Sequence, residues 1–352
     1  MRFRPAPQQA MALRKNNDSR PQILDVSPAA AIPGGEFQIR GRGLAPSDHS
    51  RVRFGDVVAP VVIGSDHFLI VRVPENAQAS ELIVGNGDHS SVPWTCGIGI
   101  QIADSLHPVA NPVIDRYGNI YTTFSGSPGQ KTPVSIYKID TNYRPKPLVT
   151  DLMNATGLAF DPAGVLYASS RHDGVVYQIS PAGNLAVYVE GMGVATGIVF
   201  DPEENLYVGD RSGTIFKISR SRQIYVFATL EPSIAAYHLA FGPDGYLYVT
   251  GPTTSSYDAI HRISSDGRVE LFYRGLGRPQ GMAFDVQGNL YVAASLSGRR
   301  GVVRLSPDAR AELFLSGPAI VGLAFTPSKS MVLATHNSLF RVDAGIEGRK
   351  IP

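Results

Sequence analysis

The sequence predicts an all-β protein in which a small β-sandwich precedes a six-bladed β-propeller. One short pattern recurs six times after residue 110, at intervals of 40 to 46 residues, which is the length of a propeller blade. Residues 21–97 lack this repeat and show short alternating apolar segments separated by Pro, Gly, Asn and Asp, as in a sandwich. The 36 glycines and 26 prolines suit a chain built from tight turns.

Charge and cysteine content exclude several classes of protein. The net charge of +2 gives no overall attraction for nucleic acid, although a local basic patch is compatible with it. Cys96 is the only cysteine, so the chain has neither an internal disulfide nor a zinc site built from cysteines. No run of residues approaches the 18 apolar positions of a membrane span.

The first 20 residues are predicted to form a disordered basic tail. They contain five basic residues among Pro, Gln and Asn, and they lack the apolar core of a secretory signal. A tail that docks on an acidic partner is the alternative. The chain as written is therefore expected in the cytoplasm, whereas a truncated start would be compatible with export.

The segment 21–97 is expected to fold as one domain without catalytic residues. Its strands are predicted at residues 37–40, 51–54, 68–73 and 81–84. The segment resembles the IPT/TIG family of immunoglobulin-like domains in four short motifs: Pro33-Gly-Gly35, Gly41-Arg-Gly43, Val52-Arg-Phe-Gly55 and Val71-Arg-Val-Pro74. That resemblance implies an Ig-like sandwich that serves as a spacer or an interaction module.

The propeller repeat reads small–aliphatic–small–aromatic–Asp, then a Pro/Gly turn, then Leu-Tyr-Val. Its last position, here called the anchor, is occupied by Asp115, Asp161, Asp201, Gly242, Asp285 and Thr326. A tyrosine follows six residues after each anchor except the last, which has Val332. Four positions before the anchor, four repeats have glycine, while Asn111 and His238 stand in the other two. Small residues there let blades approach each other at the axis.

The ring is expected to close with a strand from before the first repeat. Each blade continues with a third strand, and five of them with a fourth, but the last blade has only residues 344–352 left after its third strand. The apolar segment 98–102 has no partner of its own. It is predicted to pair with residues 339–342 and so to cover the exposed edge of the last blade. The propeller then spans 98–345, with a tail over 346–352.

The repeats resemble NHL repeats and the six-bladed regucalcin/gluconolactonase group across residues 98–343. The gluconolactonase resemblance implies a divalent cation bound about five residues before the anchors. This chain has Ala110, Thr156, Thr196, Tyr237, Gln280 and Val321 there. None is a carboxylate, so we predict no metal and no cofactor, with calcium at the channel mouth as the alternative.

A recognition site is predicted on the face that carries the loops between second and third strands, here called the loop face. Mixed charge beside aromatic residues at a channel mouth suits a small polar ligand, a sugar or a peptide segment. The candidate ligand-binding residues are Arg171, His172, Asp173, Asp210, Arg211, Tyr237, His238, Gln280 and His336. The candidates for catalysis are His238, Tyr237, Asp210 and His336. Alternatively these are solvated loop residues, and His238 is a buried, hydrogen-bonded plug of the axis.

Three functions follow from these features. The favoured one is a ligand- or protein-binding propeller without catalysis, expected to be a monomer. The second is a gluconolactonase-like hydrolase or lyase for a small lactone, ester or sugar derivative, with a non-standard site. The third is an RNA-binding NHL propeller, suggested by third-strand basic residues but disfavoured because these are spread around the rim without stacking aromatics.

Overall fold

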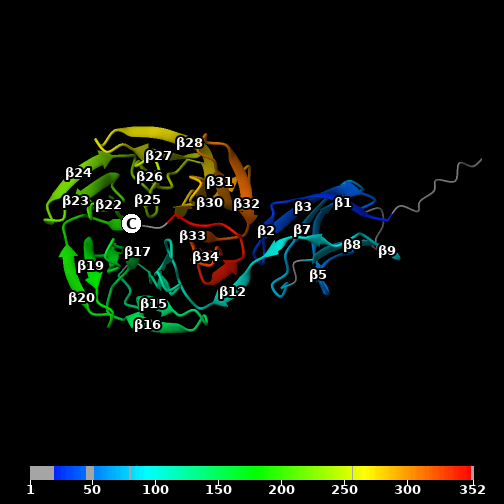
Figure 1. Cartoon of the computed structure of the whole chain (residues 1–352), viewed down its shortest axis with the longest axis horizontal. Helices are drawn as coiled ribbons and strands as arrows, with labels where there is room; N and C mark the ends of the chain where they lie inside the picture. The colour runs from blue at the N-terminus through cyan, green and yellow to red at the C-terminus, as the bar shows by residue number, and fades with distance from the viewer. Residues whose placement is uncertain (1–19, 45–50, 79–80, 128, 256, 350–352) are drawn as a thin grey trace, which may run out of the picture.

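A computed structural model shows two all-β bodies joined side by side (Figure 1). It describes residues 20–44, 51–78, 81–127, 129–255 and 257–349. Most of the predicted N-terminal tail lies outside the described residues. No helix long and apolar enough to cross a bilayer occurs in the described part of the chain.

The first body consists of two antiparallel sheets over a shared core. One sheet has the order β1 (Gln22–Ser27), β3 (Glu36–Arg42), β7 (Phe68–Arg72) and β6 (Val61–Gly64). The other has the order β10 (Trp94–Thr95), β8 (Glu81–Asn86), β4 (Arg51–Phe54) and β5 (Val57–Ala59), with β9 (His89–Ser90) beside β8. Phe37 of the first sheet and Phe54 of the second are fully buried with ring centroids 5.8 Å apart. The alternation of apolar residues in the sequence therefore places one side of β3, β4, β7 and β8 in the core, whereas β6 is exposed along its length.

The second body is a ring of six blades, each a four-stranded antiparallel sheet. Blade 1 consists of β13 (Val113–Ile114), β14 (Ile120–Thr123), β15 (Ile136–Ile139) and β16 (Pro145–Val149). Blade 2 consists of β17 (Ala155–Phe160), β18 (Leu166–Ser170), β19 (Val175–Ile179) and β20 (Leu185–Val189). Blade 3 consists of β21 (Ala195–Phe200), β22 (Leu206–Asp210), β23 (Thr214–Ile218) and β24 (Ile224–Thr229).

Blades 4 and 5 share a larger sheet because β28 also pairs with β30. They comprise β25 (His238–Phe241), β26 (Leu247–Thr250), β27 (Asp258–Ile263) and β28 (Val269–Gly277), then β29 (Met282–Phe284), β30 (Leu290–Leu296), β31 (Arg299–Leu305) and β32 (Ala311–Ser316). Blade 6 consists of β33 (Ile320–Phe325), β34 (Met331–Thr335), β35 (Leu339–Val342) and β12 (Ile100–Ala103).

The strand β12 closes the ring as the sequence predicts. It pairs with β35 in antiparallel register, with Ile100 opposite Arg341 and Ala103 opposite Leu339. Ile98, also expected in this strand, belongs instead to the two-residue strand β11 (Gly97–Ile98). An N-terminal strand thus supplies the outer strand of the last blade and covers the edge of β35.

Aromatic side chains join successive blades. The second-strand tyrosine of one blade packs against the Phe before the anchor of the next, as Tyr207 does with Phe241 at a centroid distance of 5.1 Å. The same pairing recurs from blade 1 to blade 6. At the closing junction, Val332 replaces the tyrosine and Ile114 replaces the phenylalanine, and the two lie in one apolar cluster. The last repeat departs from the pattern at Val332 and the first repeat at Ile114, and the two aliphatic side chains keep the junction packed.

The two bodies share hydrogen-bonded backbone. The short strand β2 (Ala30–Ala31) pairs in parallel with β32 of blade 5, and β11 pairs in parallel with β2. Ile32 is 1% exposed and belongs to the core between blades 5 and 6. The Ile32 N–H donates to the Ser316 carbonyl, and the Glu36 N–H donates to the Ser316 hydroxyl at 2.8 Å. The sheet of blade 5 therefore continues through β2 and β11, two short strands that belong to neither sheet of the sandwich.

Candidate functional site

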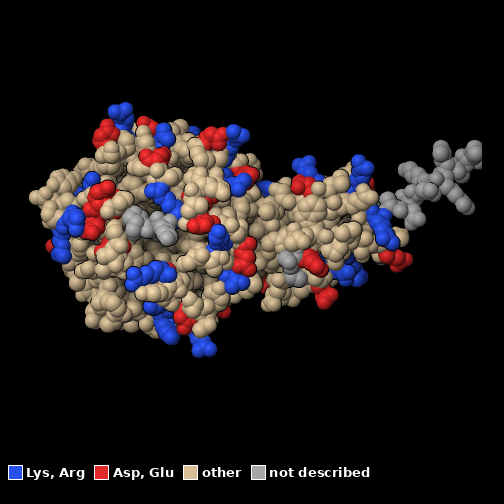
Figure 2. All heavy atoms as spheres, in the orientation of Figure 1, with Lys and Arg blue, Asp and Glu red and all other residues tan. Residues whose placement is uncertain are grey.

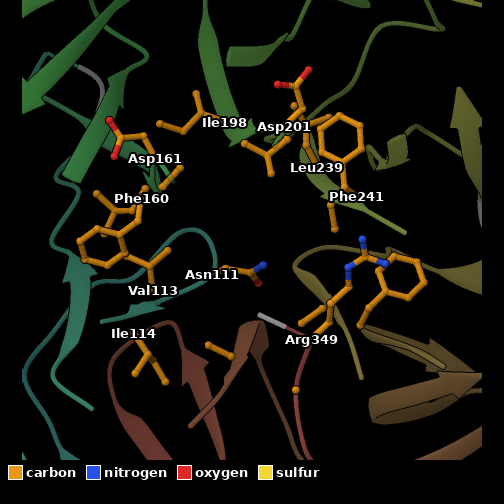
Figure 3. Close-up of a pocket in the computed structure, with 18 of the residues that line it drawn as sticks. Asn111, Val113, Ile114, Phe160, Asp161, Ile198, Asp201, Leu239, Phe241 and Arg349 are labelled. Carbon is orange, nitrogen blue, oxygen red and sulfur yellow. The ribbon is translucent and has the colours of Figure 1, made fainter. Parts of the chain in front are cut away.

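A central cavity of about 1310 Å³ lies along the propeller axis. It extends from the hub to the turns that join first and second strands, and this side of the ring is here called the turn face. Figure 3 shows its lining, with Asn111 near the middle and Arg349 reaching in from the C-terminal segment. The cavity therefore opens away from the loop face, where the sequence predicts the site.

The wall of the cavity comes from the repeat itself. The first strands contribute small and aliphatic residues at two successive positions, among them Leu158, Ala159, Ile198, Val199, Leu239, Ala240, Met282, Ala283, Leu323 and Ala324. Because the residues two before the anchor are mostly alanine, they leave the axis open at this end. This part of the wall is apolar and suits the body of an organic molecule, whereas charged residues of the turns and third strands line the cavity toward the turn face.

The anchor aspartates at the turn face are held by their own turns. Asp115 accepts hydrogen bonds from the backbone N–H groups of Tyr117 and Asn119, from the Asn119 amide and, at 3.1 Å, from the Tyr121 hydroxyl. Asp201 and Asp285 accept the same bonds from the Asn four residues later and the Tyr six residues later, and Asp285 also accepts from the Gln287 N–H. These carboxylates fix the turns, which explains why Asp and Tyr recur six residues apart.

Burial, together with the anchor aspartates, also raises the pKa of the tyrosine hydroxyls six residues after the anchors. Burial, followed by the charge of Asp201, raises the pKa of the Tyr207 hydroxyl. Burial and Asp285 raise the pKa of Tyr291 to about 12 in the same way. Both phenols therefore remain protonated donors at neutral pH.

Asn111, one of the two residues that break the glycine position, joins three blades at the hub. Its Oδ1 accepts from the Leu323 N–H of blade 6 at 3.0 Å, and its Nδ2 donates to the Met282 carbonyl of blade 5 at 2.8 Å. A side chain from the first blade thus satisfies backbone groups of the last two. Asn111 is a structural element of ring closure.

His238, the other such residue, lines the cavity but is only 4% exposed. Burial lowers the pKa of its imidazole to about 4. The ring is therefore neutral at physiological pH and presents one N–H donor and one nitrogen acceptor.

Arg349 is brought to the cavity by the last described residues. The Ile346 N–H donates to Lys329 of blade 6, and the Arg349 N–H donates to the Phe284 carbonyl of blade 5 at 2.9 Å. Residues 346–349, which the repeat pattern leaves in a tail, therefore lie bound against two blades. Sequence reasoning missed Arg349 because nothing local indicates where such a segment turns.

Tyr237, predicted at the channel mouth, is a packing residue that is 2% exposed. Its hydroxyl donates to the Glu231 carbonyl, and its N–H donates to Thr196 Oγ1 at 3.1 Å. A Cβ on Gly251 would lie 2.4 Å from the Tyr237 ring, and one on Gly209 would lie 2.6 Å from Tyr237 Cβ. The ring therefore fills space that two glycines leave between blades 3 and 4.

The other residues predicted on the loop face are dispersed among local contacts. Asp210 accepts from the Ser212 N–H of its own turn at 3.4 Å and from the Val194 N–H of the loop before β21 at 2.9 Å, and Asp173 accepts from the Tyr177 hydroxyl at 2.8 Å. The backbone of Gln280 is bonded within the blades, while His172 and His336 are exposed.

Arg171 and Arg211 occupy equivalent places in neighbouring blades. Each donates to a loop carbonyl, Arg171 to Gly126 at 3.1 Å and Arg211 to Ile234 at 3.4 Å. Burial, then the nearby Arg211, lower the pKa of Arg171. Arg171 and Arg211 therefore lie within electrostatic reach of each other, and Asp210 lies within reach of Tyr237, whose pKa burial, then Glu231 and Asp210, raise to about 12.

The residues at the position where the gluconolactonase resemblance implies a cation do not suit one. The Thr156 hydroxyl donates to the Asn154 carbonyl at 3.0 Å and the Thr196 hydroxyl to the Gly209 carbonyl at 2.7 Å. Within the described residues, no three His, Cys, Asp or Glu side chains gather closely enough to hold a metal ion. The hard carboxylate oxygens that calcium requires are not supplied at this position.

Third-strand basic residues, the basis of the RNA alternative, have partners within the blades. Lys138 and Lys217 lie over the rings of Tyr121 and Tyr207, each 5.4 Å from the centroid. Arg262, Arg304 and Arg341 pair with Glu270, Glu312 and Tyr143. On the face drawn in Figure 2, basic and acidic residues alternate without forming a single patch.

Comparisons with known proteins identify a fold. No family model matches the chain, and no curated protein matches its sequence. A protein described as a candidate gluconolactonase aligns with a TM-score of 0.59 over 72% of this chain and 94% of its own, at 16% identity. An auxiliary nutrient binding protein from Bacteroides thetaiotaomicron gives 0.56 over 92% and 98%, at 12% identity. An inactive virginiamycin B lyase from Staphylococcus aureus, solved with quinupristin, gives 0.51 over 93% and 96%, at 14% identity.

These similarities and the blade topology define the class by its fold: the protein contains a β-propeller, the fold of the candidate gluconolactonase and of the virginiamycin B lyase. Propellers of this class carry binding as well as catalytic sites, so the class leaves the activity open.

Proposed function

We propose that this protein is a non-catalytic binding protein that holds a small organic molecule in the central cavity. The observation that carries the proposal is the 1310 Å³ cavity with an apolar wall, which is large enough for such a ligand. The polar residues of the repeat at its rim are engaged in the turns, and the histidine in its wall is neutral. The site thus differs from the loop-face mouth that the sequence favours.

A neutral fluorescent probe, N-phenyl-1-naphthylamine, tests this proposal. Its emission rises when it leaves water for an apolar cavity, so titration with the wild-type chain should give saturable binding at one site. Ala324→Phe, which places a ring in the cavity wall, should weaken that binding at least about tenfold. Val187→Phe adds the same ring on an outer strand where Val187 is 52% exposed, and it should leave the affinity unchanged. Equal effects of the two variants, or no saturable binding, would refute the proposal.

A hydrolase or lyase is the second candidate, because neutral His238 lines the cavity and could accept a proton from a bound substrate. It predicts turnover of small lactones or esters that His238→Ala abolishes while probe binding persists. Probe binding without any turnover in the wild type supports the non-catalytic proposal instead.

We also propose that residues 21–97 are an IPT/TIG-type domain and that the blades are NHL-type repeats. The four sequence motifs of residues 33–74 and the two-sheet sandwich support the IPT/TIG assignment. The turns in which a Tyr hydroxyl donates to the anchor Asp support the NHL assignment. Because the sandwich is hydrogen-bonded to blade 5, its proposed role is that of a rigid spacer. Small-angle scattering that shows two independently moving bodies would contradict that role.

A further inference from the structure

The C-terminal segment delivers a single arginine into the central cavity through backbone bonds to two blades. The Val286 N–H donates to the Glu347 carbonyl at 3.0 Å, and Gly348 bridges to Asp285. A Cβ on Gly348 would lie 2.2 Å from Phe325, so only glycine allows the segment to lie this close. Arg349 follows immediately and is placed by the Phe284 carbonyl. Its position is therefore fixed by the fold.

Arg349 differs from the other cations around the cavity. Lys138 and Lys217 lie over tyrosine rings, and Lys329 pairs with Glu347 at 3.1 Å. Arg116 is exposed to solvent and lies over the Tyr117 ring, 4.9 Å from its centroid. Among the described residues, no carboxylate or carbonyl accepts a hydrogen bond from the Arg349 guanidinium. This half-buried group lines the cavity beside an apolar wall and keeps its planar set of donors available.

The acidic residues near the rim do not replace an external partner. Asp161 and Asp201 hold their own turns and accept from Tyr167 and Tyr207. Both oxygens of each carboxylate thus already accept hydrogen bonds within the blade. A ligand that brings its own anionic group can therefore pair with Arg349.

We propose that the ligand of the central cavity is an amphipathic organic monoanion. Its carboxylate or sulfonate accepts hydrogen bonds from Arg349, while its apolar body lies against the Leu239 and Ala240 side of the wall. This inference rests on the binding function proposed above and adds the chemical class of the ligand. Of the two arginines in the described lining, Arg116 is exposed and Arg349 is half-buried, so one partly desolvated guanidinium is available for one anionic group, which favours a monoanion over a polyanion.

Two dyes that share a ring system test the inference. 8-Anilinonaphthalene-1-sulfonate is N-phenyl-1-naphthylamine with one sulfonate added, so the ratio of their affinities isolates the contribution of the charge. Arg349→Gln should weaken the sulfonate dye about tenfold, equal to about 1.4 kcal/mol, and leave the neutral dye within about twofold. Arg300→Gln makes the same charge change at an exposed position of the loop face and should affect neither dye.

The outcomes separate this inference from the function on which it rests. If Ala324→Phe blocks both dyes but Arg349→Gln changes neither, the cavity binds ligands without using Arg349 and the inference is overturned. A parallel loss of both dyes in Arg349→Gln also overturns it, because the arginine then supports the cavity rather than the charge. If neither dye binds the wild type, the proposed function itself is wrong.

Discussion

Replacing Asn111 with the residue that most repeats have should destabilise the propeller. Four of the six equivalent positions are glycine, so a comparison among the repeats suggests that Asn111→Gly would stabilise the ring. Asn111→Ala makes nearly the same change but keeps a Cβ. The structure gives the opposite expectation. Among the described residues, the Asn111 amide is the one side-chain group of blade 1 that is hydrogen-bonded to both the Leu323 N–H and the Met282 carbonyl.

The magnitude follows from these two hydrogen bonds. Leu323 and Met282 are each 1% exposed, and an unsatisfied buried N–H costs about 1–3 kcal/mol. The Met282 carbonyl loses one donor, which adds less than about 1 kcal/mol. Asn111 lines the cavity, so water recovers part of both terms. We expect Asn111→Ala to cost about 2 kcal/mol, and Asn111→Gly somewhat more because glycine gains entropy in the unfolded chain.

Scanning calorimetry measures this difference, which corresponds to a fall of about 4–8 °C in the melting temperature of a domain of roughly this size. Trp94, the only tryptophan, lies in the sandwich, so its fluorescence shows whether the sandwich melts together with the ring. Asn184→Ala removes an exposed amide and should shift stability by less than about 0.5 kcal/mol. Wild-type or higher stability in Asn111→Ala would refute the role of this side chain in closing the ring.

Two further predictions concern His238 and Tyr237. Between pH 6.5 and about 4 the unfolded chain binds a proton that buried His238 does not, so stability should fall as the pH is lowered through this window. The effect is about 3 kcal/mol or less, and thermal melts of His238→Gln should lack it; parallel pH curves for variant and wild type would contradict this. Gly251→Ala should cost about 1–3 kcal/mol because its Cβ would lie 2.4 Å from the Tyr237 ring. Adding Tyr237→Leu should relieve part of that cost, and strict additivity of the denaturation free energies would show that the ring is not the obstacle.

The blades and their closure could be predicted from the sequence because each depends on a repeated local pattern. The six-residue spacing of Asp and Tyr, as in Asp161 and Tyr167, marks a turn and a strand in four of the six blades, and the structure adds that the two side chains are hydrogen-bonded to each other. The partner of residues 100–103 followed from an unpaired edge, which is a property of sheets in general.

The open end of the channel could not be predicted in this way. It depends on how six side chains fill a ring in three dimensions, and one of them, Tyr237, turns into the gap between blades instead of toward the axis. The attachment of the sandwich was equally hidden, because β2 and β11 have two residues each and show no periodicity. Arg349 is positioned by backbone contacts about 60 residues from its blade 5 partner in sequence, beyond the reach of any local pattern.

The repeat also explains where a specific site has to come from. Its polar residues serve the fold: the anchor aspartates hold turns, the tyrosines join blades, and third-strand cations cover those tyrosines. What the repeat leaves at the axis is an apolar wall that is much the same in every blade. Groups that distinguish one ligand from another therefore arise where the chain departs from the repeat. At the cavity these are Asn111, His238 and Arg349; the first is occupied in closing the ring and the second is neutral, which leaves Arg349 to supply the charge.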